Sequence, residues 1–121
     1  MININATGTS PEIILDEPNH TLRIKGESYP ENAFSFYEPV FDWFHNKFPA
    51  MDEFVLEINL SYMNSSSTKC ILDILDIVNE AGIQGRKVRV DWLYDPENSR
   101  SLELAEEFKE DLEIPFEMIP F

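Results

Sequence analysis

Cysteine, glycine and positive charge are all scarce in this chain of 121 residues. The single cysteine, Cys70, rules out a disulfide within the chain and so a secreted scaffold held together by disulfides. The four glycines form no Gly-rich phosphate-binding loop. Nine Lys and Arg stand against 23 Asp and Glu, giving a formal net charge of −14. That charge argues against nucleic acid or an anionic membrane surface as a partner.

Long apolar runs are also missing. No segment approaches the roughly 18 consecutive apolar residues that a membrane-spanning helix requires. The N-terminus lacks the basic stretch and the apolar run of a signal peptide. We therefore expect a soluble cytoplasmic protein with no membrane partner. What is present, 43% hydrophobic and 12% aromatic residues, is typical of one globular domain spanning residues 1–121.

The hydrophobic pattern predicts an α/β fold in the order β-β-α-β-α-β-α-β. Residues 1–11 are polar, and we expect them to form a loosely held arm. The predicted elements are strands at 12–15, 21–25, 54–60, 87–92 and 115–119, and helices at 28–48, at 66–81 and from residue 95 onward. Right-handed crossovers would build a mixed, mostly parallel sheet of about four or five strands, with the helices on one face or on both.

The expected helix ends follow local signals. Ser28 with Glu31 three residues later is typical of a capping box, Gly82 is the expected C-cap of the second helix, and Asp95 is the expected N-cap of the third. Aromatic residues predict one continuous face on the first helix, at Phe34, Tyr37, Phe41, Phe44 and Phe48. Pro39 lies within that helix and is expected to kink it or to remove one hydrogen bond.

Groups able to carry out catalysis are not gathered in any motif. His20 and His45 do not lie at metal-ligand spacing from a cysteine or a carboxylate. Cys70 lies within a predicted helix, and we expect a small core residue there rather than a reactive thiol. The carboxylates are spread along helix faces, as on a solvated acidic surface. We therefore predict no catalytic residue, no cofactor and no metal.

Four consecutive hydroxyl residues, Ser65, Ser66, Ser67 and Thr68, lie between the clearest predicted strand and a helix start. A helix cap followed by a polar linker is the simpler explanation, but a cap needs only one hydroxyl and four are present. A phosphate at this position would instead meet free backbone N–H groups and the positive end of the helix dipole. The segment therefore indicates a phosphorylation switch. A constitutive interaction module and an unrecognised enzyme or small-ligand site are the alternatives.

Three stretches of the chain follow a known pattern in order and with matching spacing. They are Gly-Glu-Ser-Tyr-Pro-Glu-Asn at 26–32 with the aromatic helix after it, Tyr-Met-Asn-Ser-Ser-Ser at 62–67 followed by Lys69 and residues 71–75, and Val-Asp-Trp-Leu-Tyr-Asp at 90–95 leading to 105–108 and 115–116. With these stretches the chain resembles the SiaC-type regulatory phosphoproteins, whose fold is STAS-like, as in anti-sigma-factor antagonists.

The resemblance implies a non-catalytic regulator. A partner-switching protein kinase would phosphorylate the polar segment, and a PP2C-type phosphatase would remove the phosphate. The unmodified form would bind and activate a diguanylate cyclase, in cyclic-di-GMP signalling and biofilm formation. An adaptor similar to an anti-sigma-factor antagonist, without a phosphoswitch, is the alternative. By motif position the acceptor is Ser65, which directly follows Asn64, with Ser66 second, Thr68 third and Ser67 last.

Partner contacts are expected around the same segment. The candidate partner-binding residues are Asn64, Lys69, Tyr29 and Tyr62. The exposed side of the helix at 66–81 and the neighbouring aromatic helix complete the expected docking surface. Tyr29, Tyr37 and Trp92 are candidate exposed anchors, with packing in the core as the alternative for each.

Overall fold

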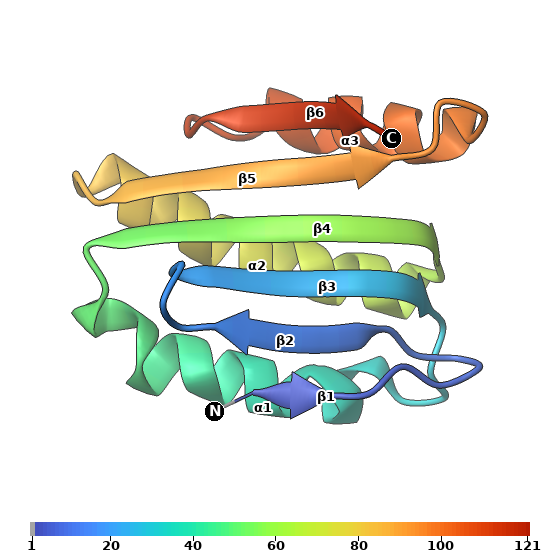
Figure 1. The fold of residues 1–121 in the computed structure, drawn as a ribbon, viewed down its shortest axis with the longest axis horizontal. Helices are drawn as coiled ribbons and strands as arrows, with labels where there is room; N and C mark the ends of the chain where they lie inside the picture. Colours follow the sequence, from blue (N-terminus) through green and yellow to red (C-terminus); the bar gives the residue numbers. More distant parts are fainter. Residues whose placement is uncertain (1) are drawn as a thin grey trace.

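In the computed structural model, which describes residues 2–121, six strands form one mixed sheet in the order β1-β2-β3-β4-β5-β6 (Figure 1). The strands are β1 (Asn3–Ile4), β2 (Glu12–Asp16), β3 (Thr21–Ser28), β4 (Glu53–Met63), β5 (Lys87–Tyr94) and β6 (Phe116–Pro120). The helices are α1 (Ala33–Asn46), the short 3-10 turn η1 (Phe48–Ala50), α2 (Ser65–Ile83) and α3 (Ser99–Glu110). The predicted α/β class and mostly parallel sheet are confirmed, with one strand more than expected.

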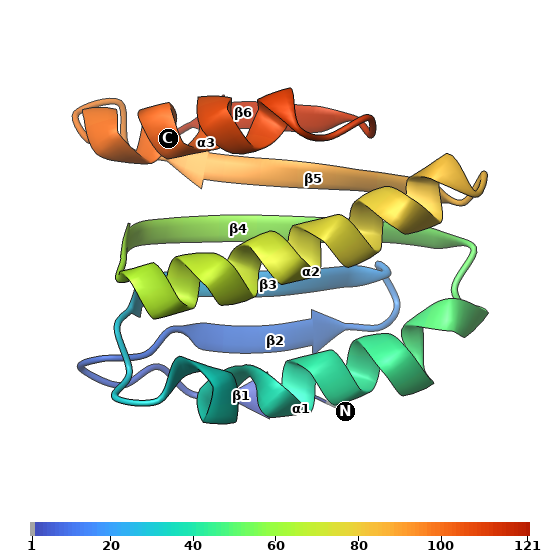
Figure 2. The same ribbon diagram turned by 180° about the vertical axis from the view of Figure 1, so that it is seen from behind.

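The direction of the strands explains how the layers are arranged. β1, β2 and β3 are antiparallel neighbours, whereas β3, β4, β5 and β6 run parallel to one another. Each parallel step passes through one helix, and crossovers of one hand in an unbroken strand order place every helix on the same side. Figures 1 and 2 show α1, α2 and α3 together on one face of the sheet. Residues 2–121 therefore form two layers, and within this range no helix covers the other face of the sheet.

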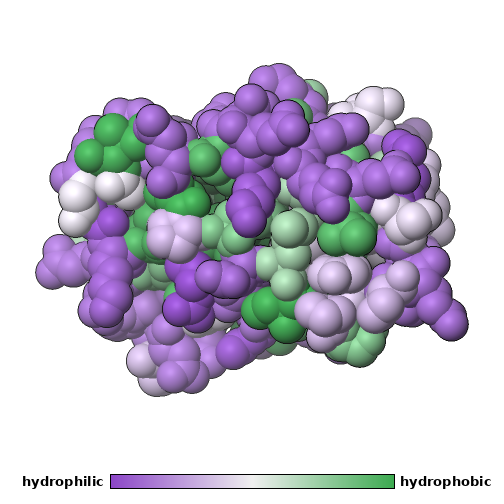
Figure 3. Space-filling model, turned by 90° about the horizontal axis from the view of Figure 1, so that it is seen from above, coloured by the Kyte–Doolittle hydropathy of each residue, from purple (hydrophilic) through white to green (hydrophobic). Residues whose placement is uncertain are grey.

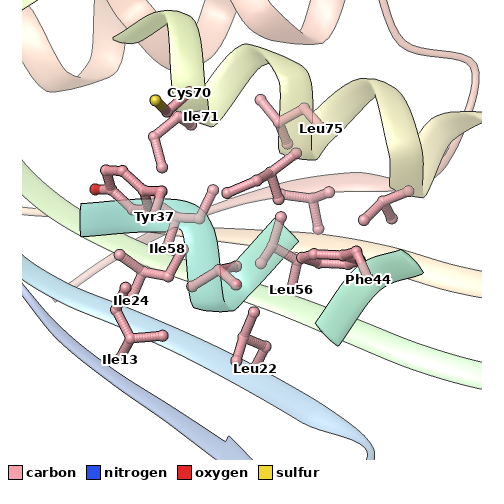
Figure 4. Packing of buried hydrophobic residues seen from close by; sticks show 14 of the residues in the cluster. Ile13, Leu22, Ile24, Tyr37, Phe44, Leu56, Ile58, Cys70, Ile71 and Leu75 are labelled. Atoms are coloured by element: carbon pink, nitrogen blue, oxygen red, sulfur yellow. The ribbon is translucent and has the colours of Figure 1, made fainter. Parts of the chain in front are cut away.

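The core lies between the sheet and the helices. Along β4, alternate residues are buried from Phe54 to Leu60, so one face of the strand packs on the helices. Figure 4 shows the centre of this core, where the labelled residues are Ile13, Leu22, Ile24, Tyr37, Phe44, Leu56, Ile58, Cys70, Ile71 and Leu75. At the far edge, α3 buries Ala105 and Phe108 and turns its glutamates outward. Figure 3 looks down on this edge and shows hydrophilic residues over most of it.

The start of α1 differs from the capping-box prediction. α1 begins at Ala33 with Asn32 as its N-cap, and Ser28 ends β3 with its side chain fully buried. Pairing of β3 with β4 holds Ser28 extended, and this tertiary contact overrides the local capping signal. The buried face is also rotated from the predicted one, because Phe34 is 57% exposed while Val40 and Trp43 are buried.

Two other helix ends were assigned to the wrong residue. Gly82 lies inside α2, where a Cβ would collide with the side chain of Ile114, so it is needed for close packing rather than as a C-cap. Gly85, three residues later, has the left-handed backbone at φ +98. The N-cap of α3 is Asn98, and Asp95 lies in the preceding turn, where its carbonyl accepts the amide of Asn98.

The expected loosely held arm is fastened along most of its length. Ile2 is buried, and the two residues of β1 pair with β2. Further along, Ser10 is buried, and the carbonyl of Thr9 accepts the amide of Tyr29 at 2.7 Å. The expectation of a loose arm is therefore wrong for residues 2–11, and Met1 lies outside the described residues.

Candidate functional site

Three helices begin at the same edge of the sheet, and all three are capped in the same way. α1, α2 and α3 follow the carboxyl ends of β3, β4 and β5, as Figure 2 shows. In each case an Asn side-chain oxygen accepts the amide of a Ser three residues later, and the pairs are Asn32–Ser35, Asn64–Ser67 and Asn98–Ser101, at 3.1, 2.9 and 3.2 Å. The repeated Asn-x-x-Ser spacing is a sequence signal common to all three helix starts, and it differs from the capping residues that were expected for α1 and α3.

The four hydroxyls at the start of α2 face different environments. Ser65 and Ser66 occupy the first helical positions and are exposed, whereas Ser67 is fully buried. Thr68 is half-buried, and its Oγ1 donates to the carbonyl of Asn64 at 2.9 Å. A kinase needs a hydroxyl that reaches solvent, so the geometry favours Ser65 and Ser66. The burial of Ser67 argues against it as an acceptor.

A chain of three buried hydroxyls lies directly beneath these exposed serines. Ser28 Oγ donates to Ser67 Oγ at 2.7 Å, and Tyr37 Oη lies 2.7 Å from Ser28 Oγ. All three side chains are 0% exposed. Burial raises the pKa of Tyr37 to about 12, although the hydrogen bond with Ser28 acts in the opposite direction. Tyr37 is therefore a neutral phenol at physiological pH.

A β-bulge shifts the pairing just before the corner between β4 and α2. Gly26 of β3 pairs with Leu60 of β4, but the next residue, Glu27, pairs with Tyr62, which leaves Ser61 without a partner in β3. Gly26 adopts φ +131, a conformation that favours glycine. Such a bulge re-aims the side chains that follow it.

Tyr62 reaches the surface because of this bulge. Strict alternation along β4 would bury Tyr62, but the extra residue buries Met63 instead and leaves Tyr62 48% exposed. Its ring packs edge-on against Tyr29, 38% exposed, with the ring centres 5.7 Å apart. Tyr29 is itself fixed by a bond from its hydroxyl to the carbonyl of Gly8 at 2.7 Å. Tyr29 and Tyr62, both candidate partner-binding residues, therefore form one exposed aromatic pair near the corner.

Two other aromatic candidates lie in the core. Tyr37 and Trp92 are 0% exposed, so the prediction that they form surface anchors is wrong. Trp92 follows the inward alternation of β5, and its indole N–H donates to Ser101 Oγ at 3.1 Å. Core packing, the alternative considered for both residues, is what the structure shows.

Lys69 faces away from the start of the helix. Its Nζ lies 2.8 Å from Asp73 Oδ1, one turn further along α2. The hydrogen bond and the charge of Asp73 raise the pKa of Lys69. The ammonium is therefore engaged along the helix flank and does not contact the first-turn amides.

Reactive groups elsewhere do not converge. Within residues 2–121 no three His, Cys, Asp or Glu side chains come together as a metal-binding group. Cys70 is buried in the core, and burial raises the pKa of its thiol. His45 Nδ1 lies 2.8 Å from the carbonyl of Phe41, on its own helix. None of the helices in the described part of the chain is long and apolar enough to cross a membrane.

Known proteins match this chain over nearly its whole length. The family model for SiaC family regulatory phosphoproteins matches residues 4–121. An uncharacterised protein of Pseudomonas aeruginosa (strain UCBPP-PA14) is 42% identical over 117 residues, which are 95% of this chain and 92% of that protein.

Solved structures of SiaC from Pseudomonas aeruginosa share the fold. The apo-SiaC crystal structure matches with a TM-score of 0.92 at 38% identity, over 98% of this chain and 97% of that one. SiaC in complex with the diguanylate cyclase SiaD, of which it is the activator, matches with a TM-score of 0.95 at 38% identity over all of both chains. The resemblance found in the sequence is confirmed: the chain belongs to the SiaC family of regulatory phosphoproteins.

Proposed function

We propose that this chain is a phosphorylation switch whose unmodified form binds and activates a diguanylate cyclase. Membership of a regulatory phosphoprotein family supports a switch, and the complex of the relative SiaC with the cyclase SiaD supports the class of partner. The observation that carries the proposal is the exposure of Ser65 and Ser66 at the first positions of α2, beside hydroxyls that are buried or already bonded.

Ser65 is the proposed acceptor, with Ser66 as the second candidate. A phosphate on Ser65 would lie at the first helical position, where backbone N–H groups have no acceptor within the helix. It would also lie at the positive end of the dipole of a 19-residue helix. These features stabilise the phosphate without a basic side chain, and Lys69 is already paired with Asp73.

The phosphate acts on the partner through charge and bulk rather than through a change of fold. It adds about −1.5 to −2 charges to a chain whose formal charge is already −14. Asn64 and the buried hydroxyl chain hold the corner from within, so the backbone has little freedom to move. The exposed pair of Tyr29 and Tyr62 supplies aromatic contacts for the partner next to the site of modification.

A kinase and a phosphatase complete the proposed cycle. A partner-switching protein kinase would add the phosphate, and a PP2C-type phosphatase would remove it. Both enzymes would act on an acceptor at a helix start, where the side chain projects from a rigid turn. The unmodified chain would then be free to bind the cyclase and to raise its output of cyclic-di-GMP.

The test combines mapping of the phosphate with binding. The chain is incubated with ATP and a kinase of the SiaC system, and the modified residues are identified by mass spectrometry. Binding to the cyclase is then measured for the wild type, Ser65→Ala and Ser65→Asp. We expect phosphate on Ser65 or Ser66, wild-type binding for Ser65→Ala, and weaker binding for Ser65→Asp.

Ser99→Asp is the matched control. Ser99 is exposed at the first position of α3, directly after the capping Asn98, so the variant adds the same charge in the same local setting on a different corner. We expect Ser99→Asp to bind the cyclase as the wild type does. Equal binding by Ser65→Asp, Ser99→Asp and the wild type, with no phosphate between Ser65 and Thr68, would contradict the switch and favour a constitutive interaction module.

A further inference from the structure

We infer that the buried hydroxyls of Tyr37, Ser28 and Ser67 act as positioning residues that fix the acceptor turn for the kinase. The inference rests on the proposed function, because it concerns the same corner. It goes further by assigning a role to three side chains that have no exposed surface for a kinase or a cyclase to contact. Each of them is fully buried, and together they join β3, α1 and the first turn of α2.

Ser28 holds the acceptor turn at two points. Its carbonyl accepts the amide of the capping Asn64 at 3.0 Å, and its Oγ donates to Ser67 Oγ at 2.7 Å. Ser65 and Ser66 lie between these two attachments. The turn that carries the exposed hydroxyls is therefore fixed on both sides to the end of β3.

Tyr37 supplies the other end of the chain. Since Ser28 has one hydroxyl proton and gives it to Ser67, the bond between Tyr37 and Ser28 takes its proton from Tyr37. The raised pKa of Tyr37 keeps that proton in place at physiological pH. The three hydroxyls thus form a chain with one direction, from α1 through β3 to α2.

The chain of hydroxyls distinguishes the start of α2 from the starts of α1 and α3, which have the same Asn cap. At the start of α3, Ser101 is buried as Ser67 is, but it accepts its bond from the indole of Trp92. At the start of α1, Ser35 is exposed. Among the three helix starts in residues 2–121, only the one that bears the proposed acceptor is joined by hydroxyls to a second helix. A buried polar chain costs free energy unless it is fully bonded, so it specifies one arrangement.

Loss of the hydrogen bonds between these hydroxyls would loosen the first turn of α2 without unfolding the domain. Tyr37→Phe removes one oxygen and keeps the ring, and Ser28→Ala removes the central hydroxyl and keeps the strand. The first turn of α2 would then sample more than one arrangement, and the kinase would find Ser65 in the productive one less often. We expect kcat/KM for phosphorylation to fall by roughly 2- to 10-fold, the range that corresponds to one net hydrogen bond.

The experiment measures kinase kinetics and site occupancy together. Phosphorylation of full-length wild type, Tyr37→Phe, Ser28→Ala and the double variant is followed at a temperature where circular dichroism shows all of them folded. We expect the loss in the double variant to be close to that of either single variant, because the chain acts as a unit. We also expect the wild type to carry phosphate on one serine and the variants to spread it over Ser65 and Ser66.

Ser101→Ala controls for simple destabilisation. It removes a buried, bonded hydroxyl at the equivalent position of α3, so it weakens the fold without touching the acceptor turn. We expect its kcat/KM and its site occupancy to equal those of the wild type. If Ser28→Ala does not fold, Tyr37→Phe carries the test alone.

Two failures can be told apart. In the first, the wild-type protein is phosphorylated between Ser65 and Thr68, but the kinetics and site occupancy of the variants match those of the wild type or of Ser101→Ala. This result would overturn the positioning role and leave the proposed function intact. A wild-type chain that takes no phosphate between Ser65 and Thr68 would overturn both.

Discussion

The two ends of α1 are held in place by different kinds of contact. At one end Trp43, Phe44, Phe48 and Phe54 pack ring against ring, with ring centres 4.9–5.9 Å apart. At the other end the contact is the chain of buried hydroxyls that begins at Tyr37. Figure 4 shows Phe44 and Tyr37 at opposite sides of the same core.

The two kinds of contact differ in how closely they fix the positions of atoms. Apolar burial is nearly proportional to area and tolerates small shifts, so the aromatic end supplies stability without fixing any one atom. Hydrogen bonds between hydroxyls weaken steeply with distance and angle, so the other end fixes the positions of a few oxygens. The exposed serines lie at the hydrogen-bonded end, where atomic positions are fixed most closely. Variants at each end should therefore affect stability and phosphorylation to different extents.

The largest expected effect is at the aromatic end. Phe44→Ala removes a buried ring that contacts three other aromatic side chains, and we expect it to lower the free energy of unfolding by about 3–5 kcal/mol. Urea denaturation measures this. Phe34→Ala is the matched control, because Phe34 is an exposed aromatic residue of the same helix, and its expected effect is within about 0.5 kcal/mol. Similar losses for the two variants would contradict the assigned face of α1.

The buried phenol of Tyr37 should make the free energy of unfolding fall at high pH. The pKa of Tyr37 is raised from 10 to about 12 in the folded state, so folding favours the protonated phenol. This stabilisation is complete below pH 10 and is lost as the pH rises from about 10 through 12, with a total of about 3 kcal/mol. Urea denaturation at pH values between 8 and 11.5 should show a steeper decline for the wild type than for Tyr37→Phe. Parallel curves would show that Tyr37 is less shielded than its burial indicates.

A smaller effect is expected at the cap. Asn64→Ala removes the oxygen that accepts the amide of Ser67, and a lost cap of this kind costs about 1 kcal/mol. Asn32→Ala removes the equivalent cap of α1 and should cost a similar amount, but only Asn64→Ala should also slow phosphorylation of the corner. Thermal denaturation and kinase assays on the two variants separate the two roles. Equal phosphorylation of both would show that the cap contributes only stability.

The order of elements could be predicted because it depends on local pattern. Alternation along 54–60 and the helical spacing of Ile71, Ile74, Leu75 and Val78 hold for any globular arrangement of those segments. The four hydroxyls were also found, because their identity and their position after a strand are visible in one dimension. The family resemblance added the expected order of the acceptors, which no pattern of burial in the sequence contains.

What could not be predicted depends on contacts between distant residues. Ser28 resembles a helix cap locally, but pairing with Met63 of β4 extends it and turns its hydroxyl toward Ser67. The bulge at Ser61 reverses which of two neighbouring residues is buried, so alternation alone would hide Tyr62. β1 exists because it pairs with β2, and two residues are too few to give a pattern. In each case the deciding interaction joins segments that no local window includes.

The smallest expected effect concerns Lys69, which the sequence suggested as a partner-binding residue beside the acceptor. Its ammonium is held by Asp73 on the exposed flank of α2, and exposed ion pairs of this kind contribute little to stability. Lys69→Gln should leave the melting temperature unchanged within error. It should also leave the rate of dephosphorylation of the modified corner unchanged, because a phosphate on Ser65 would be held by first-turn amides rather than by the ammonium. If the variant loses its phosphate several-fold faster, Lys69 must leave Asp73 and bind the phosphate after modification. The hydroxyl end of α1 would then be less rigid than the aromatic end.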